Sequence, residues 1–125
     1  MKALIIMALS ALFAVSPQAA QQKATPEDFV VVSDNTENGV RSISAIPSPL
    51  VCTKKIDIQI DARSNKVIKC VFTRGCAGNL NAVSILIQGM TVKEVLEKLD
   101  GNPCGKRGTS CTDQLCRVLK QCYKL

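Results

Sequence analysis

Apolar residues recur with a period of two along two stretches in the middle of the chain. Residues 56–61 carry isoleucine at every second position, which predicts a half-buried strand. A second strand is expected over residues 66–72, after the polar turn at 62–65. Its alternation gives two faces, which are Ile68, Cys70 and Phe72 on one side and Val67, Lys69 and Val71 on the other. Two strands joined by a short polar turn predict a β-hairpin.

Helical periodicity follows the hairpin in three segments. The first spans about 79–89 and ends at a glycine. The second, 91–101, opens with a capping box in which Thr91 is the N-cap and Glu94 follows three residues later. The third, about 112–123, places its apolar residues on one face. The pattern predicts a small single-domain α+β fold of the order ββααα.

The N-terminal part of the chain differs from this domain. Residues 1–20 have a short positive start, a thirteen-residue apolar run and small residues near its end, which is typical of a signal peptide. The run is too short to span a bilayer, so we expect no transmembrane segment after signal removal. Residues 21–49 are polar and are expected to form a flexible linker before a domain at 50–125. This organisation predicts an exported protein, periplasmic or secreted.

Composition narrows the chemistry that the chain can perform. The 125 residues include seven cysteines and no histidine, which excludes Cys–His nucleophiles, Ser-His-Asp triads and mixed Cys/His zinc sites. From residue 50 onward, 13 Lys and Arg face 6 Asp and Glu, a net charge of +7. That charge favours a protein partner or a phosphate-bearing nucleotide. The sequence contains no P-loop and no GxGxxG, and its two aromatic side chains after residue 50 give little base stacking. No motif for sequence-specific nucleic-acid binding is present.

Four cysteines are expected at the edges of regular elements, where separate chain segments can converge. They are Cys52, Cys76, Cys104 and Cys111. Glycines flank three of the four and permit close approach of the backbone, and the nearby cations Arg74, Lys106 and Arg107 help a thiolate to form. The remaining three, Cys70, Cys116 and Cys122, fit a packing role, with Cys70 and Cys122 on core faces and Cys116 on another, partly exposed face.

The residues alone leave the chemistry of the four thiols open. Without histidine, a soft metal would need all-thiolate ligation, by zinc or by an iron–sulfur cluster. A small exported domain with many cysteines is also the usual setting for disulfides, although seven is an odd number. A thiol redox role is a further alternative, for which Cys104 and Cys111 are the closest pair among the four. The missing Cys-x-x-Cys spacing counts against it.

Several motifs in order give the chain a family resemblance. LVCTKKIDIQID, VIKCVFTRGCAGNLNAVSILIQGM, TVKEVLEKLDG, CGKRGTSC and TDQL, within about residues 50–123, closely resemble the TSCPD domain. That domain occurs as a small four-cysteine protein and as the C-terminal module of adenosylcobalamin-dependent (class II) ribonucleotide reductases. The resemblance implies that the family's four cysteines are Cys52, Cys76, Cys104 and Cys111, forming a site that staples the fold. Thr112 stands where the family motif has proline.

The resemblance implies an accessory role beside a ribonucleoside-diphosphate reductase. If the four thiolates bind a metal, zinc is expected, because it takes four thiolates tetrahedrally, and an iron–sulfur cluster is the alternative. The resemblance also carries the family associations with nucleotide binding and DNA synthesis, and a cytoplasmic location as the alternative to export. About seventy-five residues cannot enclose the barrel, nucleotide site and cofactor site of a reductase, so catalysis by this chain alone is not expected. The alternatives are an exported disulfide-bonded interaction module and a thiol redox or nucleotide-binding accessory protein.

Overall fold

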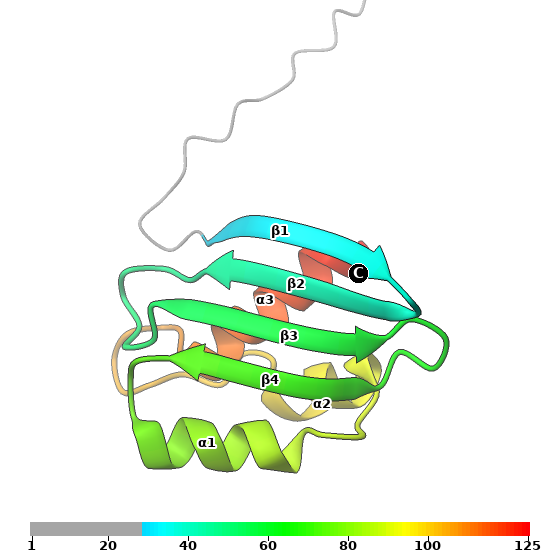
Figure 1. Ribbon diagram of the computed structural model, residues 1–125. Helices are drawn as coiled ribbons and strands as arrows, with labels where there is room; N and C mark the ends of the chain where they lie inside the picture. The colour runs from blue at the N-terminus through cyan, green and yellow to red at the C-terminus, as the bar shows by residue number, and fades with distance from the viewer. Residues whose placement is uncertain (1–28) are drawn as a thin grey trace, which may run out of the picture.

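The computed structural model describes residues 29–125, which form one antiparallel sheet with three helices (Figure 1). The signal peptide predicted at 1–20 lies outside the described residues. The four strands are neighbours in chain order, β1-β2-β3-β4. Their bounds are Val30–Glu37 for β1, Val40–Ile46 for β2, Lys55–Asp61 for β3 and Val67–Thr73 for β4. The α+β class is confirmed, and the sheet is twice as wide as the sequence indicated.

Strands β1 and β2 correct the boundary drawn between linker and domain. Residues 30–46, which the polar composition assigned to a flexible linker, pair as an antiparallel hairpin. The turn between the strands is Asn38-Gly39, and both residues have positive φ, 51° and 78°. Asn-Gly with this geometry matches the right-handed twist of the flanking strands. The sheet therefore begins at residue 30, and the domain includes most of the segment expected as linker.

The hairpin of β3 and β4 is confirmed, but the faces of β4 differ from simple alternation. The pairing shifts by one residue between Gln59 and Ile60, so that Ile60 lies opposite Val67 while Gln59 lies opposite Lys69. Ile68 is the extra residue of this bulge, and its side chain is exposed rather than on the core face. Val67, expected on the opposite face, is instead buried with Cys70.

Three helices follow the sheet, as the periodicity predicts. They are α1 at Ala77–Leu86, α2 at Val92–Leu99 and α3 at Cys111–Tyr123. The capping box of α2 is confirmed, because the Glu94 backbone N–H donates to the Thr91 hydroxyl and the Thr91 backbone N–H donates to the Glu94 carboxylate. No helix within residues 29–125 is long and apolar enough to cross a membrane.

The core lies between one face of the sheet and helices α2 and α3. Figure 1 shows α3 behind the sheet and α1 along its β4 edge. The buried apolar cluster joins the inward isoleucines of β2 and β3 to Val95 of α2 and to Leu115 and Leu119 of α3. The end of α3 is tied to the sheet by Arg41, which donates to the Cys122 carbonyl at 2.8 Å and stacks over the Tyr123 ring.

Candidate four-cysteine centre

The four cysteines picked from the sequence lie around one hollow at one end of the domain. Three loops meet there, the β2–β3 loop (residues 47–54), the β4–α1 loop (74–76) and the α2–α3 loop (100–110), at the left of Figure 1. The hollow has a volume of about 400 Å³. Cys52, Cys76, Cys104 and Cys111 all line it. Chain segments up to 59 residues apart in sequence therefore bring their thiols to one place.

Cys52 and Cys76 reach the hollow from the sheet side. Thr53 is buried, and its hydroxyl donates to the Thr73 carbonyl at 3.0 Å, which ties the β2–β3 loop to the end of β4. Gly75 then passes close by with φ +101°, and a Cβ there would lie only 3.2 Å from the Thr53 backbone nitrogen of that loop. Cys76 is the N-cap residue of α1, and its thiol makes no capping hydrogen bond. Glycine is therefore needed for the close approach of these two segments.

Cys104 and Cys111 come from the other side of the hollow. The α2–α3 loop folds back on itself, with the Cys104 N–H donating to the Thr109 carbonyl at 3.0 Å. Ser110 is the N-cap of α3, and its hydroxyl accepts from the Asp113 N–H at 3.0 Å. Cys111 is therefore the first residue of the helix, where backbone N–H groups lack partners within the helix and the positive end of the helix dipole lies.

A buried polar network fixes the loops behind the thiols. The Asp113 carboxylate is 2% exposed and accepts from the Gly101 N–H at 2.8 Å, the Thr109 hydroxyl at 2.7 Å and the Arg117 guanidinium at 2.8 Å. Burial alone would raise the pKa of Asp113, but these hydrogen bonds and the Arg117 charge lower it below its ordinary value. The carboxylate therefore holds the start of α3 and both ends of the α2–α3 loop together.

Gln114 extends this network to the loop that carries Cys52. Its side chain is fully buried, its amide oxygen accepts from the Ser48 N–H at 3.0 Å, and its amide nitrogen donates to the Thr109 hydroxyl at 3.0 Å. In the sequence, Asp113 and Gln114 stand out only as part of the TDQL stretch that resembles a family motif. A polar pair at the first turn of an apolar helix face was the available signal that both side chains are structural.

Arg107 is the charged residue that faces the thiols. Its Nη1 donates to the Cys52 Sγ at 3.3 Å, and its charge also acts on Cys104 and Cys111. The hydrogen bond from Arg107 is the largest cause that lowers the pKa of Cys52, and the Arg107 charge is the next. The sequence placed a cation here correctly, and the geometry gives it a specific partner.

The four thiols are the type of ligand that a soft metal prefers, but their side chains are not arranged as a ligand shell. Four thiols around one hollow are the ligands that zinc takes in structural sites. As the side chains stand, no three His, Cys, Asp or Glu residues in the described part of the chain are arranged so that they could hold a metal ion. Cys76 and Cys104 are exposed, so their side chains have room to turn toward the hollow.

The other three cysteines lie away from the hollow and pack against the core. Cys70 is buried on the inner face of β4, as predicted, and burial raises the pKa of its thiol to about 12. Cys116 was expected on a partly exposed face, but it is fully buried against α2, because α3 buries more than one stripe. Burial raises the pKa of Cys116 to about 12 and that of Cys122 to about 11. These thiols are poor nucleophiles and poor ligands.

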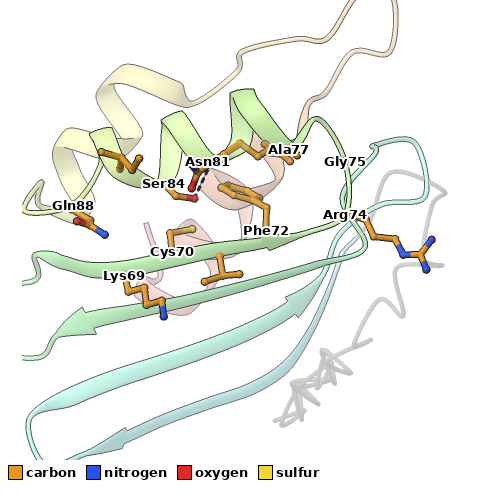
Figure 2. A pocket seen from close by; sticks show the side chains of 12 residues that line it. Lys69, Cys70, Phe72, Arg74, Gly75, Ala77, Asn81, Ser84 and Gln88 are labelled. Carbon is orange, nitrogen blue, oxygen red and sulfur yellow. Dashed lines mark hydrogen bonds between the residues drawn. The ribbon is translucent and has the colours of Figure 1, made fainter.

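A second cleft, between β4 and α1, contains one of these buried thiols. Figure 2 shows Cys70 and Phe72 pointing from β4 toward α1, and Asn81 and Ser84 pointing back from the helix. The Ser84 hydroxyl donates to the Leu80 carbonyl at 2.9 Å, so it is already engaged within its own helix. Arg74 points away from this cleft. The cleft thus offers no cluster of chemically active groups.

A comparison with known protein families places the chain in one of them. The chain matches the family model of the TSCPD domain over residues 22–123. The chain belongs to the TSCPD domain family. The matched region includes β1 and β2, in agreement with the sheet that the structure builds from them. Membership of this family supports, at the level of the family, a role as a module associated with ribonucleotide reductase. No curated protein and no solved structure matches the chain.

Proposed function

We propose that this TSCPD protein is an accessory module in which Cys52, Cys76, Cys104 and Cys111 bind one metal ion, with zinc as the preferred ion. The observation that carries the proposal is the convergence of these thiols, from three loops and a helix start, on one hollow. Zinc accepts four thiolates and has no redox chemistry of its own, so its contribution would be a structural tie between the segments. An iron–sulfur cluster uses the same ligands and is the runner-up.

The residues around the hollow support this role. Arg107 stabilises the ionised form of Cys52, and Cys111 is the first residue of α3, at the positive end of the helix dipole. The Asp113 and Gln114 network holds the α2–α3 loop, the β2–β3 loop and the helix start in place from behind. The thiols are therefore brought near one another by contacts that do not involve a metal. Rotation of the exposed Cys76 and Cys104 side chains is the change that ligation requires.

The role of the module is assistance to a larger enzyme of nucleotide metabolism. The domain is a single sheet with three helices, and its polar network is used in folding rather than in a cleft that could enclose a nucleotide. The cationic loops, which include Arg107 and Lys106, suit contact with an acidic partner. The family association makes a ribonucleotide reductase the first partner to test.

The test measures metal and thiols on the same sample of the full chain, prepared without added metal. Elemental mass spectrometry is expected to find about one zinc per chain. Cys111→Ser should lose that zinc, because three thiolates hold the ion far less tightly than four. Cys122→Ala is the matched control, since Cys122 does not line the hollow, and it should keep the zinc.

Three results would overturn the metal site. One is a Cys111→Ser protein that keeps a full zinc complement. Another is loss of zinc in the Cys122→Ala control alone. The third is a wild-type protein without metal in which thiol titration after denaturation finds about one thiol, which means three disulfides. Iron and acid-labile sulfide in place of zinc would keep the ligands and change the group that they bind.

A further inference from the structure

Helix α1 has the composition of a buried helix although one side of it is exposed. Its ten residues, Ala77–Leu86, include no charged side chain. Ile85 is 60% exposed and Leu86 is 69% exposed. Surface helices normally carry charged residues on their outer face, whereas helices that lack them are usually covered. The composition of α1 therefore indicates that something packs against it.

An apolar groove runs along α1 on the side away from β4. The four-cysteine hollow and a second hollow of about 180 Å³ share Val83 and Leu86 as lining residues, so the two adjoin each other along α1. The opposite wall of the groove is Leu99 at the end of α2 and Pro103 in the following loop. The groove is concave, and its two hollows together approach the size at which proteins hold a ligand or a short segment.

Cations stand at both ends of this groove and no acidic residue lines it. Arg107 lies at the cysteine end and Lys98 at the far end. Neither takes part in a salt bridge with any residue of the described range 29–125. From Ala62 to Lys93, the stretch that includes α1, the sequence has no Asp or Glu. An apolar surface between two cations that make no salt bridge, one of them bonded only to the Cys52 thiol, complements a segment that is apolar in its middle and acidic at its ends.

We propose that this groove binds an acidic amphipathic peptide segment of a partner protein, with apolar side chains against Leu86 and Val83 and carboxylates near Lys98 and Arg107. A concave groove fits a helix or extended segment laid along α1, which is a common mode of peptide recognition. A lipid surface is a worse match, because membrane binding requires apolar side chains that project outward from a convex face. The proposal does not depend on a bound metal.

Two exposed residues of α1 provide a variant and its matched control. Leu86 lines the groove, whereas its neighbour Ile85 lines the β4–α1 cleft on the other side of the helix. Both are more than half exposed, so Leu86→Ser and Ile85→Ser should each leave the fold intact. Lys98→Glu reverses the charge at the far end without touching a cysteine. Lys69→Glu, outside the groove, is its control.

The experiment selects peptides from a random display library of about 16 residues, roughly 24 Å when helical, on the full immobilised chain. The enriched peptides should combine Leu, Ile or Phe with flanking Asp and Glu. The best of them is then synthesised with a fluorescent label for anisotropy titrations. Leu86→Ser should weaken its binding about tenfold, the effect of losing one well-buried leucine contact. Lys98→Glu should weaken it as well, while both controls bind as the wild type does.

The opposite outcomes overturn the proposal. They are no enriched peptide, an acid-poor consensus, or equal binding by Leu86→Ser and Ile85→Ser. Leu86-dependent binding to phosphatidylserine vesicles with none to peptides would assign the surface to a membrane instead. A further outcome is that residues 1–28 of the chain resist protease without peptide and are cleaved when peptide is added. The occupant of the groove would then be the protein's own N-terminus. Zinc content measured on the same variants separates failure of the groove from failure of the metal centre.

Discussion

Replacement of Asp113 by alanine is the sharpest test of how the cysteine loops are held. The carboxylate accepts three hydrogen bonds, from Gly101, Thr109 and Arg117. A hydrogen bond to a charged group contributes about 1.5–3 kcal/mol. Arg117 is one-third exposed, and Gly101 is exposed, so water can replace part of what these two donors lose. Thr109 is 2% exposed, and its hydroxyl would lose its acceptor in a buried position.

These contributions give a loss of about 3 kcal/mol for Asp113→Ala, which is a large part of the stability of a domain this size. For about 100 residues, that change lowers the melting temperature by roughly 15 °C. Urea unfolding is followed by far-ultraviolet circular dichroism, because the chain has no tryptophan. A chelator and a reductant are present, so that the result reports the network rather than a metal.

Asp100→Ala is the control for this measurement. Asp100 also pairs with a residue of α3, Lys120, but both side chains of that ion pair are 37% exposed. An exposed ion pair contributes about 0–1 kcal/mol, so Asp100→Ala should change stability little. If Asp113→Ala and Asp100→Ala cost the same, or if Asp113→Ala costs less than about 1 kcal/mol, the buried network is not what holds the loops.

Three further predictions follow from the same geometry. Gly75→Ala should destabilise the fold by about 2 kcal/mol or more, measured by urea unfolding, because the residue has φ +101° and its Cβ would lie 2.8 Å from the Leu80 Cδ1. A loss below about 0.5 kcal/mol would mean that the two segments do not approach so closely. In metal-free protein, iodoacetamide should label the exposed Cys76 and Cys104 quickly and the buried Cys70 and Cys116 slowly, as measured by mass spectrometry. Equal rates would contradict the burial. The Arg41 hydrogen bond lowers the pKa of Asp34, so the ionised carboxylate stabilises the fold above the ordinary value of 3.8, and this contribution is lost as pH falls below it. The difference in unfolding free energy between wild type and Asp34→Asn should therefore shrink between about pH 6 and pH 2, and a constant difference would refute the link.

The elements with strong periodicity were predictable from the sequence. The isoleucines of β3 and the capping box of α2 each report one local interaction, and the structure confirms both. β1 and β2 were missed because polar residues dominate β1 and the rest of the segment around them, and most of β1 faces solvent. The Asn38-Gly39 turn was the available signal, since this dipeptide between alternating residues is the strongest short-range mark of a hairpin. The polar composition outweighed it.

The bulge in β4 shows where a pattern of period two stops being sufficient. One extra residue, Ile68, exchanges the faces of Val67 and Ile68 at the start of the strand, and only the register against β3 determines the position of the bulge. Burial of Cys116 has a similar cause, because α2 covers a side of α3 that a single helical stripe does not reveal. The four cysteines at element edges were found from local context. The buried network of Asp113 and Gln114 was not, since it joins loops that only the fold brings together.

The relation between the core and the hollow determines what a metal would do in this protein. The apolar core includes Cys70 and Cys116 and none of the four cysteines around the hollow. Asp113 and Gln114 fix the loops through hydrogen bonds that need no ion. A zinc finger lacks both features, and its metal supplies most of its folding free energy. Here the sheet and helices have their own apolar and polar supports, so an ion bound by the four thiols would act mainly on the loop end. Because that end adjoins the groove beside α1, metal binding would order one end of the surface that we propose for the partner.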